Sequence, residues 1–176
     1  MEGEGRSGRY LAFELGGEQF AVEVERVEVV LETVPITRVP NAPPHLRGVI
    51  NYRGAVIPVA DLRTRFGDGR TATGEGTSTI VLQIKYGAED ITIGILADSV
   101  REVIDLDPSR IERPPRLAGS VDDALVAGIG ESDGRFIVVL DIDEAFKALD
   151  GAARGAAVAG VPEFQGGAVE ARAPAR

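Results

Sequence analysis

The chain has 176 residues, of which 44% are hydrophobic and 27% are charged, and its formal net charge at pH 7 is −9. Such an acidic surface repels phosphate backbones and anionic lipid headgroups, which argues against binding to nucleic acids and to anionic membranes. The sequence contains no cysteine, which excludes disulfide bonds, thiolate catalysis and cysteine-ligated zinc. The charge is compatible with binding to proteins that have basic or mixed surfaces.

The N-terminal third has the pattern of a β protein. Residues 1–8 are mainly glycine and charged residues and predict a disordered leader, without the apolar stretch of a signal peptide. Apolar and polar residues then alternate over 10–30, interrupted by a glycine pair that predicts a hairpin turn. Residues 48–66 predict a strand, a tight turn and a second strand.

Proline and glycine mark the connections between these strands. Four prolines lie within 35–44 and exclude a helix interior or a central strand there. Residues 67–79 are rich in glycine and threonine and predict a loop. Residues 107–123 predict another irregular connection, with one helical turn after its first proline.

The second half repeats the strand pattern. Strands are predicted over 79–106 and 126–142, followed by a short helix for which Asp141 or Asp143 is the N-cap. The Ala/Gly-rich residues 151–176 have no sustained period and predict a tail. No apolar run is long enough to cross a bilayer, so we expect a soluble, cytoplasmic protein.

An internal repeat is the most informative feature. Shifting the sequence by 80 residues aligns 48–66 with 128–146 without a gap. The matched pairs are Gly48/Gly128, Val49/Ile129, Gly54/Gly134, Ile57/Ile137, Val59/Val139, Asp61/Asp141, Leu62/Ile142 and Phe66/Phe146. The chain therefore contains two copies of one small β unit. Roughly five short strands per copy favour two closed barrels side by side, the first at about 18–80 and the second at about 81–147.

The repeat separates turn chemistry from other roles at the first hairpin. Gly54 and Gly134 both remain, which indicates that each provides the positive φ of a hairpin turn. The preceding Tyr52 and Arg53 are not repeated. From the residues alone, Arg53 is equally compatible with a partner contact and with an ordinary solvated surface arginine.

The same stretch resembles a known family. The residues Gly48-Val49, Asn51-Tyr52-Arg53-Gly54, Ile57-Pro58-Val59 and Asp61-Leu62-Arg63 are similar, in order, to the signature of the CheW family of bacterial chemotaxis coupling proteins. Asn-Ala-Pro at 41–43 and the segment 97–104 resemble that family as well. The resemblance covers roughly 9–147, and we expect a CheW-like domain over 9–150.

The resemblance implies an all-β fold of two SH3-like five-stranded barrels, with short helices in the connections and at the C-terminus. It also implies a non-enzymatic scaffold, without cofactor or metal, that links the cytoplasmic tips of chemoreceptors to the regulatory domain of the histidine kinase CheA. Such a protein is cytoplasmic and is recruited to membrane-associated receptor arrays. An adaptor of another chemosensory pathway, such as pilus motility, is the near alternative.

Site residues follow from the resemblance position by position. The receptor-binding residues that it implies are Val27, Val29, Tyr52, Arg53, Val100 and Val103, with Arg53 at the rim of an apolar groove between the barrels. It implies kinase contacts at Gly48 and Val56, and a structural turn formed by Asn51, Gly54 and Gly134. Tyr52 stands where the family usually has leucine, and Val29 where it commonly has glutamate.

An enzyme is the alternative from a different class. The repeat-related Asp61 and Asp141 suggest a two-aspartate hydrolase, with one carboxylate from each barrel. Neither residue lies in the Asp-Thr/Ser-Gly turn of such enzymes, and each follows a strand and opens a predicted helical turn, which favours N-caps. His45, the only histidine, lies in a proline-rich connection and indicates no catalytic constellation.

Overall fold

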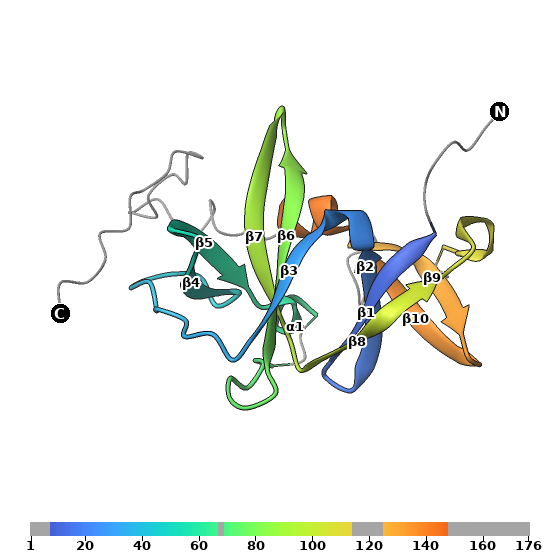
Figure 1. The fold of residues 1–176 in the computed structure, drawn as a ribbon, viewed down its shortest axis with the longest axis horizontal. Coiled ribbons are helices and arrows are strands. Elements are labelled where there is room, and N and C mark those ends of the chain that lie inside the picture. Colours follow the sequence, from blue (N-terminus) through green and yellow to red (C-terminus); the bar gives the residue numbers. More distant parts are fainter. Residues whose placement is uncertain (1–7, 67–68, 114–124, 148–176) are drawn as a thin grey trace.

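The computed structural model describes residues 8–66, 69–113 and 125–147 (Figure 1). Ten strands in these ranges form two five-stranded sheets. The first sheet has the order β8-β1-β2-β10-β9, with bounds β8 Ser99–Asp105, β1 Arg9–Leu15, β2 Glu18–Glu23, β10 Arg135–Leu140 and β9 Val126–Ser132. The second sheet has the order β3-β6-β7-β5-β4, with bounds β3 Val27–Glu32, β6 Ser78–Tyr86, β7 Glu89–Ala97, β5 Ala55–Ala60 and β4 Leu46–Tyr52.

The two curled sheets lie side by side, and the predicted pair of SH3-like barrels is confirmed (Figure 1). Short helical segments lie in the connections, as expected. They are η1 Val24–Arg26, α1 Leu62–Arg65, η2 Pro108–Arg110 and a helix at 142–147. No helix in the described part of the chain is both long enough and apolar enough to cross a membrane.

The predicted boundary between the barrels, 18–80 and 81–147, is wrong because the two copies exchange strands. The β1–β2 hairpin of the first copy joins β8, β9 and β10 of the second, whereas the β6–β7 hairpin of the second copy joins β3, β4 and β5 of the first. The chain crosses from the first sheet to the second at η1, and it returns at Asp98, between β7 and β8. Each barrel therefore needs both halves of the sequence.

Backbone pairing confirms the 80-residue repeat. Val59 of β5 pairs in parallel with Gly94 of β7, and the equivalent Val139 of β10 pairs in parallel with Ala21 of β2. The Asp61 amide donates to the His45 carbonyl at 2.7 Å, and 80 residues later the Asp141 amide donates to the Leu125 carbonyl at 3.0 Å. The β4–β5 and β9–β10 hairpins also carry their register shifts at equivalent places.

The buried core falls into three clusters. One draws only on residues of the first sheet and its flanking loops, and a second only on residues of the second sheet and of the segment after β3. The largest takes side chains from both sheets, so it lies between the barrels. Consecutive residues of β1 serve different clusters, Tyr10 the first barrel and Leu11 the inter-barrel cluster, because neighbouring side chains of a strand point to opposite faces.

Candidate functional site

The β4–β5 hairpin closes in a two-residue turn made by Arg53 and Gly54. Tyr52 pairs with Ala55 across it. Arg53 has φ 52° and Gly54 has φ 80°, the two positive values of a type I′ turn. The Gly54 amide donates to Asn51 Oδ1 at 3.0 Å, which fixes the turn from within. The predicted structural roles of Asn51 and Gly54 fit this geometry, as does that of Gly134 (φ 74°) in the other barrel.

Arg53 occupies a backbone conformation that arginine disfavours. The equivalent residue of the β9–β10 turn, with φ 50°, is Asp133, and aspartate is among the few non-glycine residues enriched in this left-handed region. The exposed Arg53 guanidinium lies 5.3 Å from the centroid of the Tyr52 ring. Within the described residues it makes no hydrogen bond or ion pair. Apart from this contact with the Tyr52 ring, no interaction among the described residues favours arginine at this position, and its donors face solvent.

Val27 and Val100 occupy equivalent positions in the two barrels. Val27 begins β3 and pairs with Leu82, while Val100 lies in β8 and pairs with Phe13. Both strands are edge strands of their sheets, and both valines are half-buried against the inter-barrel cluster. Two of the expected receptor contacts therefore lie at equivalent places, one in each barrel, and both pack against the inter-barrel cluster.

Val103 continues this surface along β8, and the residue is 43% exposed. It pairs with Leu11, and the equivalent pair in the other barrel is Val30 with Ile80. Val30 is half-buried against the inter-barrel cluster, so it is a fourth valine of this surface, beyond those that the sequence indicated. Aligning β3 with β8 through the repeat would have identified it. We call Val27, Val30, Val100 and Val103 the valine surface.

Val29 and Tyr52 lie elsewhere. Both pack against the cluster inside the second barrel. A register shift between Val27 and Val29 makes Glu28 the extra residue of a β-bulge, which breaks the alternation of β3. Val29 consequently faces away from the valine surface, although simple alternation would put it on the same side as Val27. Glu28 is exposed, and its Oε1 accepts a hydrogen bond from Gln83 Nε2 at 2.5 Å.

Arg53 lies at the tip of the β4–β5 hairpin of the second sheet, whereas the valine surface lies on β3 and β8. In the hydrogen-bonded order, β4 and β3 are opposite edges of the second sheet, and β8 belongs to the first sheet. Figure 1 shows the β4–β5 hairpin and β8 on either side of the β6–β7 hairpin. The valines therefore lie on strands beside the chain crossings, and Arg53 lies at a hairpin tip.

Of the two expected kinase contacts, Gly48 is buried and Val56 is half-buried on β5. A Cβ at position 48 would lie 2.1 Å from the Thr37 carbonyl oxygen, so glycine allows the residues after β3 to pair with β4. The equivalent Gly128 makes the same close approach, to Ile111 and Glu112. Gly48 therefore has a structural reason to be glycine, and Val56 is the more accessible of the two.

Asp61 and Asp141 do not form a catalytic pair. Asp61 is fully buried, and its carboxylate accepts hydrogen bonds from the Thr71 amide and hydroxyl, both at 2.8 Å. It also forms an ion pair with Arg47 at 2.9 Å and accepts from the Arg63 amide as the N-cap of α1. Asp141 Oδ1 accepts from the Glu144 amide at 3.1 Å at the start of helix 142–147. Each carboxylate caps a helix in its own barrel, which explains both residues without catalysis.

Comparison with known proteins identifies the family of this chain. A family model of the CheW-like domain matches residues 9–150. The chemotaxis protein CheW of Klebsiella aerogenes is 29% identical over 144 residues, which cover 82% of this chain and 84% of that protein. CheW of Thermotoga maritima is 32% identical over 137 residues, 76% of this chain and 84% of that protein.

The crystal structure of the scaffolding protein TtCheW from Thermoanaerobacter tengcongensis superposes with a TM-score of 0.71 at 32% identity, covering 83% of this chain and 92% of that one. The fold, the internal repeat, the hairpin signature and these relatives all indicate the same family. The chain belongs to the CheW-like family and is a non-enzymatic adaptor of chemotaxis signalling.

Proposed function

We propose that this adaptor couples chemoreceptors to the histidine kinase CheA by binding the receptor's cytoplasmic tip and the kinase's regulatory domain at once. It does so in the cytoplasm, at membrane-associated receptor arrays. The observation that carries the receptor part is the valine surface. Val27 and Val100 are equivalent, flank the barrel junction and lie on edge strands of different sheets.

An α-helical receptor hairpin is a suitable occupant of such a surface. Amphipathic helices bind by laying an apolar face into an apolar groove, and Val103, which is 43% exposed, offers area for that contact. The polar edge of the surface carries Glu102 and Arg101, both exposed. Arg101 already forms an ion pair with Glu14 at 2.6 Å. The valines would therefore make the main contact with the receptor helix.

Arg53 would make a second contact. Residues held in disfavoured backbone regions concentrate at functional sites, and Arg53 keeps its five donors exposed at the cost of an unfavourable turn position. A carboxylate of the receptor could bind this guanidinium in two parallel hydrogen bonds. Val56, on the strand that follows the turn, is the candidate kinase contact.

Co-elution of three purified proteins tests the proposal: the full chain, the kinase regulatory domain and a receptor cytoplasmic fragment from the same genome. We expect wild type to bridge both partners. Val103→Glu and Arg53→Glu should keep the kinase domain and lose the receptor fragment, with a loss on the order of 1–4 kcal/mol per anchor. Arg135→Glu, an exposed arginine beside the other hairpin turn, and Phe136→Glu are the matched controls.

Both controls should bind like wild type. A wild-type chain that binds neither partner would contradict the coupling function, and full receptor affinity in both anchor variants would contradict the proposed surfaces.

A further inference from the structure

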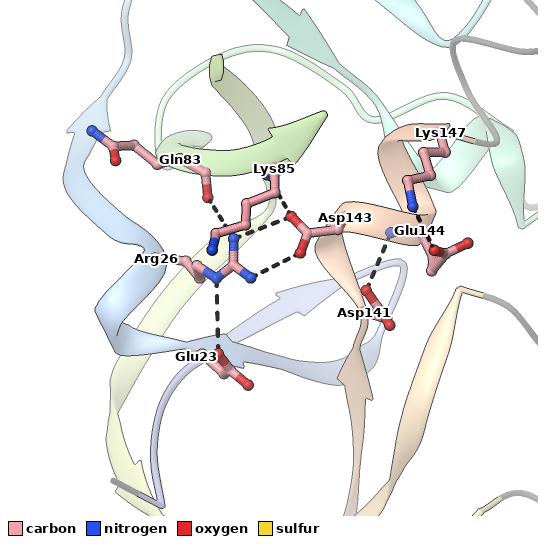
Figure 2. Close-up of polar contacts among 8 residues, drawn as sticks. All are labelled: Glu23, Arg26, Gln83, Lys85, Asp141, Asp143, Glu144 and Lys147. Carbon is pink, nitrogen blue, oxygen red and sulfur yellow. Dashed lines mark hydrogen bonds and ion pairs between the residues drawn. The ribbon is translucent and has the colours of Figure 1, made fainter. Parts of the chain in front are cut away.

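Arg26 lies where the chain crosses from the first sheet to the second. It is the last residue of η1, immediately before Val27. Its guanidinium binds the Asp143 carboxylate in a bidentate pair, with Nη1–Oδ1 at 3.1 Å and Nη2–Oδ2 at 2.8 Å. Figure 2 shows the two side chains facing each other. Asp143 belongs to helix 142–147, which follows β10 of the first sheet.

The same pair also reaches β6 of the second sheet. The Lys85 amide donates to Asp143 Oδ1 at 2.7 Å, and Arg26 Nη1 donates to the Gln83 carbonyl at 3.5 Å (Figure 2). Arg26 Nε lies 3.9 Å from the Glu23 carboxylate at the end of β2. One ion pair thus joins the crossing segment, the helix of the first barrel and a central strand of the second barrel.

The pair is partly shielded from water. The Arg26 and Asp143 side chains are 26% and 23% exposed, whereas Lys147 and Glu144, which pair within the same helix, are 50% and 43% exposed. Screening by solvent is weaker for the more buried pair. The bidentate geometry is directional, so the pair adds a polar constraint on orientation to the apolar packing between the barrels.

The shape of the valine surface depends on the orientation of the two barrels relative to each other. Val27 comes from β3 of the second sheet, and Val100 and Val103 come from β8 of the first. Val56 and the rest of the β4–β5 hairpin lie within the second sheet alone. A change in the orientation of the barrels would therefore disturb the composite surface and leave the hairpin surface intact.

We propose that Arg26 and Asp143 form a positioning pair for receptor binding: they fix the orientation of the two barrels and so keep Val27 aligned with Val100 and Val103. This inference rests on the proposed receptor contact. Neither residue needs to touch the receptor. Asp143 thereby connects the C-terminal helix to the receptor surface, with Arg26 as the intermediate residue next to Val27.

The first test measures binding of the receptor fragment and of the kinase regulatory domain separately. Asp143→Asn removes the charge but keeps an acceptor for the Lys85 amide, and Arg26→Gln removes the guanidinium. Each variant should bind the receptor fragment roughly 3- to 30-fold more weakly, the range for mutations within a coupling network, and the kinase domain within about twofold of wild type. The double variant should bind the receptor no more weakly than the weaker single variant.

Two further variants test whether the effect is specific to this ion pair. Arg26→Lys keeps a positive charge and should retain more receptor binding than Arg26→Gln. Lys147→Gln breaks the neighbouring ion pair, which lies within one helix, and should change neither affinity. Thermal unfolding of all variants separates a loss of fold from a loss of orientation.

The second test measures the relative orientation of the two barrels directly. The chain has no cysteine, so cysteines introduced at the exposed Glu89 on β7 and Arg135 on β10 can be spin-labelled without background. Pulsed electron paramagnetic resonance should give a narrow distance distribution for wild type and Lys147→Gln, and a broader or shifted one for Asp143→Asn.

The outcomes distinguish this inference from the proposed function. A wild-type chain that does not bind the receptor fragment contradicts the proposed function, and the spin-label distances then still decide whether the pair sets the orientation. Three results would overturn this inference alone, provided that the wild-type chain binds the receptor fragment. They are an unchanged receptor affinity in the variants, an equal loss of affinity for both partners, and an unchanged distance distribution.

Discussion

Phe66 and Phe146 occupy equivalent positions in the two copies, and each reaches across to the other barrel. Phe66, at the end of α1, stacks on Phe20 of the first sheet, with ring centroids 5.3 Å apart and an interplanar angle of 7°. Phe146, in helix 142–147, meets Tyr86 of β6 edge-on, with centroids 5.9 Å apart and an angle of 87°. The repeat therefore closes the barrel junction twice, with one aromatic contact from each barrel.

Truncating one of these aromatic side chains should destabilise the whole chain. We expect Phe66→Ala to lower the free energy of unfolding by about 2–4 kcal/mol, because it removes half-buried area and the stacking on Phe20. Urea denaturation followed by circular dichroism measures this. Phe136→Ala is the control: this phenylalanine is 76% exposed, so its truncation should change stability by less than about 0.5 kcal/mol. Equal effects of the two substitutions would contradict the assigned packing.

Replacing Arg53 should stabilise the fold and weaken receptor binding. Replacing it with asparagine, which tolerates positive φ, should raise the free energy of unfolding by about 0.5–1 kcal/mol. The same variant should bind the receptor fragment more weakly, because the guanidinium is gone. Chemical denaturation and a binding titration on one preparation measure both effects.

The equivalent turn supplies the reverse experiment. Asp133→Arg places arginine at φ 50° and should lower stability by about 0.5–1 kcal/mol without affecting receptor binding. A neutral or stabilising Asp133→Arg would show that arginine carries no penalty in this turn, and the functional argument from the Arg53 backbone would then fail.

Much of the local structure could be predicted from the sequence because it depends on neighbouring residues. The strands, the hairpin turns at Gly54 and Gly134 and the caps at Asp61 and Asp141 follow from alternation and turn chemistry. The repeat identified the paired architecture. The CheW-like signature, rather than any pattern of charge, indicated the function.

The partners of the strands could not be predicted in the same way. Alternation shows that β2 and β7 are strands, but it does not show which sheet each one joins. The exchange of hairpins between the copies depends on the crossings at η1 and Asp98, where no sequence signal marks a change of sheet. The bulge at Glu28 was missed for a related reason: one extra residue in β3 moved Val29 to the other face.

Gly48 gives a prediction that separates folding from binding. Alanine there would adopt φ 148° and place its Cβ 2.1 Å from the Thr37 carbonyl oxygen. Because backbone must move to relieve this contact, we expect Gly48→Ala to lower the free energy of unfolding by about 2–4 kcal/mol. Loss of kinase binding in this variant would then reflect a disturbed hairpin. A melting curve that matched that of wild type would contradict the close approach of Thr37 as the reason for glycine here.

Asp61 and Asp141 should respond differently to the same substitution, although the repeat makes them equivalent. Asp61→Asn puts an amide where the buried carboxylate accepts from Thr71 and Arg47, and the Arg47 side chain, only 13% exposed, loses its counter-ion. Breaking such a buried pair costs about 3–5 kcal/mol. Asp141→Asn keeps a side-chain oxygen for the Glu144 amide, and asparagine caps helices about as well as aspartate, so we expect a change below about 0.5 kcal/mol. Guanidinium denaturation of the two variants measures the difference, and a large effect at Asp141 would mean that its carboxylate does more than cap the helix.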